Sequence, residues 1–270
     1  RMTVAGFGDL IGKLTCLNDW ELARIINGEH YCASITRLVH ECVSDILKEA
    51  PKIKERDPET LGSVMRGLVL SGAAISLYGD SRPASGAEHH MSHYWETILE
   101  QRGERPAMHG EQVAVGTVLV LMLIEELLKE SVDFDAARRA AGEYDYDAWE
   151  AEIRAHYGAA AGEVIEMEKR VGKNDPAARL RRIDSMEKNW DAVRTQLESL
   201  PSADSLRALL ADIGCPCTPA QINVDDMLLK ETFLYCKEIR PRYTVFQTVY
   251  DLGLMDRLSD RVIARVNAEK

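Results

Sequence analysis

One stretch decides how this chain folds: His109-Gly110-Glu111-Gln112-Val113-Ala114-Val115-Gly116-Thr117-Val118-Leu119-Val120-Leu121-Met122-Leu123-Ile124-Glu125-Glu126-Leu127-Leu128-Lys129-Glu130. Its apolar side chains would cover nearly every side of a helix, which is typical of a helix buried at the centre of its domain. We therefore predict a buried helix from His109 to about Glu130. A histidine at its first position would lie near the middle of the fold.

The rest of the chain also has helical periodicity and lacks the alternating pattern of strands, so the predicted fold class is all-α. Asp57-Pro58 is a typical helix start and begins a predicted helix that ends near Tyr78. The charge-rich helix 177–200 is expected to be exposed or to contact a partner. The other predicted helices span residues 8–17, 19–26, 31–50, 88–101, 136–141, 146–156, 162–171, 205–213, 225–238, 243–250 and 254–267.

Composition narrows the class of protein. The chain has 270 residues and 46% hydrophobic residues, enough for a folded core, and a net charge of −11 that argues against nucleic acid as a partner. The apolar run Val113–Leu128 is broken by Gly116 and by two glutamates, so we expect no membrane span. Six cysteines lie mostly in apolar, helix-like segments, which indicates free thiols and a cytoplasmic protein.

Three of the seven histidines lie within five residues, directly after a loop predicted at 79–87. His89 and His93 would share one helix face, and His90 would point elsewhere. Imidazole is the commonest protein ligand for a divalent metal, yet the spacing leaves a metal or catalytic role and an ordinary polar or core role equally open. His109 is either a further imidazole ligand or a ring packed at the start of its helix.

Five charged residues near these histidines also allow two interpretations. Asp9 is either a first-turn acid favoured by the helix dipole or a ligand approached closely because glycines flank it, and Lys13 lies one turn further on the same face. Arg82 is either a solvated loop arginine or a clamp for an anion such as phosphate. Glu88 and Glu111 either orient the neighbouring histidines or face water.

Three separated motifs carry a resemblance to a known family. Gly-x-Gly-Asp ends at Asp9, Glu-His-x-x-Ser-His places its first histidine at His89, and His-Gly-Glu-x-Val-x-x-Gly begins at His109, with gaps of 80 and 20 residues. Together they resemble the metal triad of the iron-containing alcohol dehydrogenase and dehydroquinate synthase superfamily, and within it the bacterial (AraM-type) sn-glycerol-1-phosphate dehydrogenases. The resemblance is close from Met2 to about Leu127 and loose as far as Leu254.

The resemblance implies a particular domain organisation. Residues 1–270 are similar to the helical, C-terminal metal- and substrate-binding domain, with a metal-site core at 1–130 and a helical extension at 131–270. The N-terminal α/β domain that binds the nucleotide in this family is absent from this sequence, so we expect a piece of a longer protein. Because NAD(H) or NADP(H) would bind on the missing domain, we expect this chain alone to be inactive.

The resemblance also implies an activity and a metal. The family reduces dihydroxyacetone phosphate to sn-glycerol 1-phosphate with NADH or NADPH, while a divalent ion polarises the carbonyl. Asp9, His89 and His109 would hold that ion, and the resemblance favours nickel, with zinc as the alternative. A phosphorylated small molecule is then the expected partner, and a homodimer is possible.

The resemblance assigns further roles around the ion. Arg82, seven residues before His89, would bind the substrate phosphate, with Lys13 and Ser85 as further substrate contacts. His93 would be the catalytic residue that relays a proton or donates a hydrogen bond. Two alternatives remain: another polyol dehydrogenase or dehydroquinate synthase-like enzyme of the superfamily, or a non-catalytic helical module that binds metal or a partner.

Overall fold

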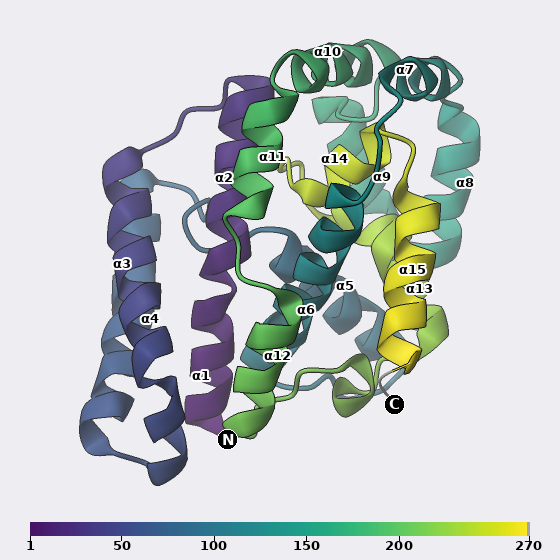
Figure 1. Ribbon diagram of the computed structural model, residues 1–270. Helices are drawn as coiled ribbons and strands as arrows, with labels where there is room; N and C mark the ends of the chain where they lie inside the picture. The colour runs from purple at the N-terminus through teal and green to yellow at the C-terminus, as the bar shows by residue number, and fades with distance from the viewer. Residues whose placement is uncertain (269–270) are drawn as a thin grey trace.

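The central helix of the molecule is α6 (His109–Leu128), as the sequence predicted. The helices that pack around it are α1 (Met2–Ile11), α5 (Ala87–Gln101), α12 (Ala203–Asp212) and α15 (Met255–Ala268) (Figure 1). The apolar side chains of α6 are buried. The structure is a computed structural model that describes residues 1–268. Over these residues the chain forms helices and turns with no strand, which confirms the all-α fold class.

The remaining helices complete the bundle. They are α2 (Lys13–Asn27), α3 (Ala33–Glu49), α4 (Pro58–Tyr78), α7 (Phe134–Gly142), α8 (Tyr146–Tyr157), α9 (Ala161–Val171), α10 (Pro176–Lys188), α11 (Trp190–Glu198), α13 (Asp226–Tyr235) and α14 (Val245–Asp251), with 3-10 turns at Ala50–Glu55, Gly158–Ala160, Pro219–Ile222 and Cys236–Ile239. Buried side chains from both sides of residue 130 form one continuous core, so the division at that residue stays a prediction. All six cysteines are free, as expected.

The first two helices differ from the prediction. The break falls at Gly12 and not near residue 18, so that α1 ends at Ile11 and α2 begins at Lys13. Asp19 resembled the start of a helix, but it lies buried inside α2. The prediction was wrong because the Asp19 carboxylate caps two other helices that are distant in sequence, as described below.

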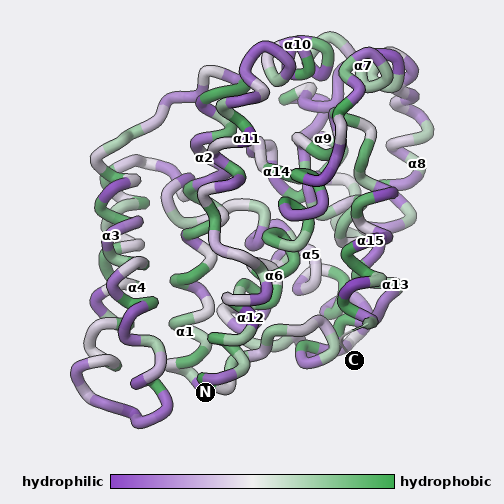
Figure 2. Tube along the Cα trace, viewed as in Figure 1, coloured by the Kyte–Doolittle hydropathy of each residue, from purple (hydrophilic) through white to green (hydrophobic). Residues whose placement is uncertain are grey.

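The charge-rich segment 177–200 is not an exposed helix. It forms two helices, α10 and α11, separated at Asn189, and both pack against α2. Arg182 on α10 is buried and pairs with Asp251 at 2.6 Å, so part of the charge that indicated a solvated face is neutralised inside the protein. Figure 2 shows hydrophilic residues concentrated on α10 and on the connection between α3 and α4.

Helix α4 begins at Pro58 with the Asp57 side chain accepting a hydrogen bond from the Thr60 amide at 2.9 Å, as the Asp-Pro pattern predicted. By length and composition alone, α4 could cross a membrane, but a single helix of this kind is weak evidence of a membrane protein. In the structure α4 packs against α1 and α3. The sequence predicted this helix but weighed only the run Val113–Leu128 as a possible membrane span. The absence of a membrane span stays a prediction.

A close crossing of α1 and α6 positions two of the candidate site residues. A Cβ atom on Gly110 would lie 1.8 Å from the Ala5 carbonyl oxygen, and one on Gly8 would lie 2.2 Å from the Gly110 carbonyl oxygen. Only glycine allows backbones to approach this closely. Because Asp9 follows Gly8 and His109 precedes Gly110, this contact brings an acid and an imidazole from distant parts of the chain together.

Candidate metal centre and substrate pocket

Asp9, His89 and His109 converge although they come from three helices. The His89 Nε2 atom lies 3.3 Å from Asp9 Oδ1, and the His109 Nε2 atom lies 3.9 Å from the same oxygen. The rings of the two histidines have their centroids 5.2 Å apart. One potential ligand atom from each of the three side chains lies within 4.8 Å of the others, a separation that one shared ion can bridge.

Both histidines are oriented by a carboxylate on the far side of the ring. His89 Nδ1 lies 2.7 Å from Glu88 Oε1, and His109 Nδ1 lies 3.0 Å from Glu96 Oε1. An Nδ1 hydrogen donated to each carboxylate would leave the Nε2 lone pair, on the side of Asp9, free to bind an ion. Two imidazoles and one carboxylate arranged in this way fit a divalent transition-metal ion.

The electrostatics of Asp9 suit the same role. Burial would raise the pKa of Asp9, but the hydrogen bond with His89 and the charge of Lys13 outweigh it and hold that pKa well below its usual range. The buried Lys13 ammonium donates to Asp9 Oδ2 at 3.0 Å and to the Asp9 carbonyl at 2.9 Å. One oxygen of the ionised carboxylate therefore holds Lys13, and the other faces the histidines.

The two glutamates next to the histidines have different roles. Glu88 is fully buried and, besides contacting His89, accepts hydrogen bonds from Thr15 Oγ1 at 2.6 Å and from the Gly86 amide at 2.8 Å. Burial would raise its pKa, but its hydrogen bonds, chiefly the one with His89, lower it. Glu111 faces away from the centre and pairs with Arg1 at 2.8 Å. Of these two glutamates, Glu88 is the one that contacts a candidate ligand.

Glu96 is a further candidate for the site that the sequence prediction did not include. Its Oε2 atom lies 3.1 Å from His93 Nδ1, and its Oε1 atom contacts His109, so it connects the predicted catalytic residue to a predicted ligand. Burial would raise the pKa of Glu96, but hydrogen bonds with His109 and His93 lower it to about 2. These three side chains form a second group that could hold a metal. The position of Glu96 one turn after His93 was the available signal.

One buried acid fixes where the helix of His89 begins. Asp19 accepts a hydrogen bond from the Ala87 amide at 2.7 Å with Oδ2, and from the Val245 amide at 2.7 Å with Oδ1. It therefore caps α5 and α14 at the same time. Burial, together with the charge of Glu88, raises the pKa of Asp19 to about 7.

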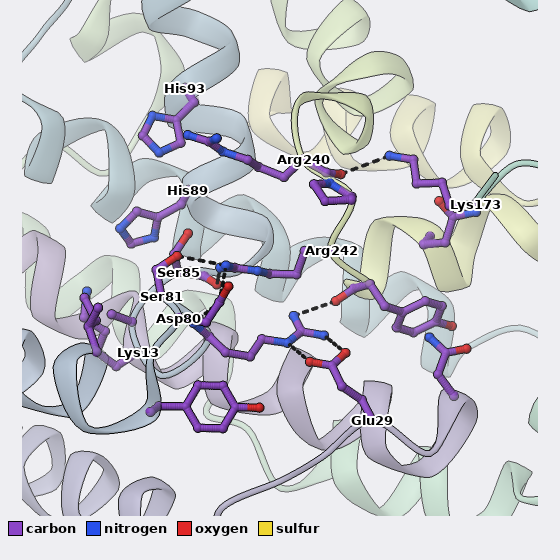
Figure 3. A pocket seen from close by; sticks show the side chains of 18 of the residues that line it. Lys13, Glu29, Asp80, Ser81, Ser85, His89, His93, Lys173, Arg240 and Arg242 are labelled. Carbon is purple, nitrogen blue, oxygen red and sulfur yellow. Dashed lines mark hydrogen bonds and ion pairs between the residues drawn. The ribbon is translucent and has the colours of Figure 1, made fainter. Parts of the chain in front are cut away.

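A cavity of about 1090 Å³ opens beside the histidines, with His89 and His93 in its wall (Figure 3). One side is formed by the loop that carries Ser81 and Ser85. The segment 240–243, from the last third of the chain, also lines the cavity and is hydrogen-bonded to this loop through Arg242 and Arg82. The predicted residues Asp9, Lys13, Arg82, Ser85, His89 and His93 all line this cavity.

The structure gives Arg82 and Ser85 partners within the protein. Arg82 is 2% exposed, and its Nε and Nη2 atoms donate to the two carboxylate oxygens of Glu29 at 2.7 Å each. Its Nη1 atom donates to the Tyr243 carbonyl at 2.8 Å. The Ser85 carbonyl accepts from Arg242 Nη1 at 2.7 Å. Phosphate binding by Arg82 stays a prediction, and its guanidinium is already engaged.

His90 points away from this cavity, as expected. It is completely buried, and neither ring nitrogen has a hydrogen-bond partner among the described residues. Burial and the nearby cations Arg242, Lys173 and Arg82 hold its pKa well below the usual range. His90 is therefore a neutral core residue.

Comparison with known proteins agrees with the motifs. No protein-family model matches the chain. The chain is 26% identical over 258 residues to glycerol-1-phosphate dehydrogenase, NAD(P)+, of Bacillus licheniformis, a match that covers 96% of this chain and 51% of that protein. It is 28% identical to the protein of the same name from Geobacillus stearothermophilus, over 93% of this chain and 54% of that protein.

A shorter match reaches higher identity. The Methanosphaera stadtmanae protein of the same name is 40% identical over 123 residues, which are 46% of this chain and 34% of that protein. The chain spans about half the length of the first two curated relatives. These matches confirm the predicted resemblance: the chain is similar to proteins named glycerol-1-phosphate dehydrogenase, over about half the length of the first two of them.

Proposed function

We propose that this chain is the metal- and substrate-binding part of an NAD(P)-dependent glycerol-1-phosphate dehydrogenase. The observation that carries the proposal is the convergence of Asp9, His89 and His109 beside a cavity that Asp9 and His89 line and that is large enough for a triose phosphate. The names of the relatives supply the substrate class. In this proposal the substrate is dihydroxyacetone phosphate and the product is sn-glycerol 1-phosphate.

The three ligands would hold one divalent ion, nickel or zinc. Such an ion supplies Lewis-acid polarisation of a substrate carbonyl when it is bound. The chain's own residues prepare the site for it. Glu88 and Glu96 fix the two imidazole rings, and Lys13 holds one oxygen of the Asp9 carboxylate.

His93 is the proposed source of a proton or hydrogen bond for the substrate oxygen. It lines the cavity on the same helix face as His89, with ring centroids 6.1 Å apart, and its Nδ1 atom is held by Glu96. This arrangement fixes the ring while the opposite nitrogen remains available. The hydride itself comes from NADH or NADPH, which would bind on a part of the enzyme that this sequence does not contain.

Binding of sn-glycerol 1-phosphate tests the proposal directly. The chain is stripped with a chelator, reloaded with nickel or zinc, and titrated by calorimetry with sn-glycerol 1-phosphate, with glycerol and with a larger polyol. The proposal expects the phosphorylated ligand to bind the metal-loaded chain at least about tenfold more tightly than the stripped chain, since part of its affinity comes from the ion. Equal affinity with and without metal, or a preference for glycerol or the larger polyol, would contradict it.

The remaining expectations belong to the same proposal. Mixed with NADH or NADPH and dihydroxyacetone phosphate, the chain alone should oxidise no cofactor above the background rate. A fusion to the other half of the Geobacillus stearothermophilus relative should do so in a metal-dependent way. A cytoplasmic location and a homodimer stay predictions, which cell fractionation and light scattering can check.

A further inference from the structure

The cavity beside the histidines carries more positive charge than its own acids neutralise. Six cations line it, and five of them have a carboxylate partner within 3.0 Å. The five pairs are Lys13 with Asp9 at 3.0 Å, Arg82 with Glu29 at 2.7 Å, Lys173 with Glu238 at 2.9 Å, Arg182 with Asp251 at 2.6 Å and Arg242 with Asp80 at 2.7 Å.

Arg240 is the sixth cation, and over residues 1–268 its side chain has no hydrogen-bond or ion-pair partner. Its backbone is nevertheless held, because the Arg240 carbonyl accepts a hydrogen bond from Lys173 Nζ at 3.1 Å. In Figure 3 the Arg240 side chain extends across the cavity toward His93 and His89. A guanidinium without a carboxylate partner is thus directed toward the histidines of the candidate metal centre.

We propose that Arg240 binds the phosphate group of the substrate, an inference that rests on the function proposed above. A guanidinium offers two parallel N–H groups that match two oxygens of a phosphate monoester. Arg82, which the sequence favoured for this role, uses all three of its guanidinium nitrogens on Glu29 and on the Tyr243 carbonyl. Arg240 keeps its donors available in the same cavity.

The surroundings of Arg240 favour an anion over a neutral ligand. Arg242, two residues further on, lines the same cavity and is held by Asp80 and by Ser81 Oγ at 2.8 Å. On a protein with a net charge of −11, this is a local positive region beside the site where the reacting carbonyl would lie.

The test uses metal-free chain, so that an ion cannot capture the phosphate. Inorganic phosphate is titrated into the wild type, Arg240→Ala, Arg240→Lys and the control Arg139→Ala, which removes an exposed arginine on α7 outside the cavity. We expect phosphate to bind Arg240→Ala at least about tenfold more weakly, Arg240→Lys to show an intermediate loss, and Arg139→Ala to match the wild type. Unfolding midpoints confirm that each variant is folded.

Equal phosphate affinity in the wild type and Arg240→Ala would overturn the assignment. An equal loss in Arg139→Ala would also overturn it, since the effect would then be general charge. A parallel titration of metal-loaded chain with sn-glycerol 1-phosphate separates the two proposals. If metal strengthens that binding but Arg240→Ala does not weaken it, the Arg240 assignment fails and the proposed function stands. If only Arg240→Ala weakens it, the phosphate site stands and the proposed function fails.

Discussion

Replacing Gly110 with alanine should separate the metal ligands without touching any of them. In the structure a methyl group on Gly110 would lie 1.8 Å from the Ala5 carbonyl oxygen, and real Cβ contacts are essentially never shorter than 3.0 Å. The obstacle is backbone, which cannot rotate away. Helices α1 and α6 must therefore part at the position that holds Asp9 next to His109.

The size of the effect follows from these distances. Forcing a methyl group into a closely packed helix crossing costs about 1–3 kcal/mol of unfolding free energy, which exceeds the roughly 0.5–1 kcal/mol that alanine gains over glycine inside a helix. Ligand atoms on a tetrahedral ion with bonds of about 2.1 Å are roughly 3.4 Å apart. His109 Nε2 and Asp9 Oδ1 are already 3.9 Å apart, so further opening should weaken metal binding at least about tenfold.

Urea unfolding of the metal-free chain and calorimetric titration with zinc measure the two effects. Gly162→Ala is the matched control, because nothing lies within 4 Å of the added methyl group in α9, and it should leave metal binding unchanged. Gly8→Ala places a methyl group in the same helix crossing from the side of α1, and it replaces Gly110→Ala in the test if that variant does not fold. Wild-type stability together with wild-type zinc affinity in Gly110→Ala would refute the reasoning.

Three further predictions concern the half-buried carboxylate of Glu96 and the buried carboxylates of Asp19 and Glu238. Glu96→Gln removes the charged acceptor of His109 Nδ1 and should lower zinc affinity by about 10- to 100-fold in a chelator competition. Asp19→Ala leaves two helix amides without their buried acceptor and should cost about 2–4 kcal/mol in urea unfolding. The pKa of Glu238 is lowered to about 2, because two buried lysines outweigh its burial. Its contribution to stability is therefore present above about pH 4.5 and is lost as the pH falls toward 2, and Glu238→Gln should flatten that part of the acid unfolding curve.

Each of these predictions has a result that would exclude it. An unchanged zinc affinity in Glu96→Gln would show that His109 needs no orienting carboxylate. Asp133→Ala removes a single cap from the exposed start of α7 and should cost about 1 kcal/mol, so an equal cost for Asp19→Ala would show that the double cap adds nothing. If the stability of Glu238→Gln falls with pH as steeply as that of the wild type between pH 4.5 and 2, Glu238 does not cause the loss of stability in acid.

The sequence predicted the features that depend on neighbours along the chain. The all-round apolar pattern of α6 and the Asp57-Pro58 start of α4 are local signals, and both helices begin where expected. The boundary between α1 and α2 was wrong because the role of Asp19 is not local. Its carboxylate caps helices that begin 68 and 226 residues away, and no pattern around Asp19 reveals that.

The candidate site also combines residues that local motifs reveal with residues that only the tertiary fold brings together. The motifs around Asp9, His89 and His109 could be recognised in the sequence, and the structure brings the three side chains together. Arg240 and Arg242 carry no motif of their own, and they reach the histidines only because the chain folds its last third across the cavity. Arg82 was readable as an anion clamp, but its pairing with Glu29, 53 residues earlier, depends on the tertiary fold.

The central claim is that Asp9, His89 and His109 hold one ion, and metal stoichiometry tests it most directly. Chain stripped of metal is dialysed against nickel or zinc, and bound metal is counted for the wild type, Asp9→Ala and Glu96→Gln. The account predicts one ion per wild-type chain, none retained by Asp9→Ala and weakened retention by Glu96→Gln. A wild type that binds no ion, or an Asp9→Ala chain that keeps its ion while Glu96→Gln loses it, would contradict the account, and the second result would place the metal on His93, Glu96 and His109 instead.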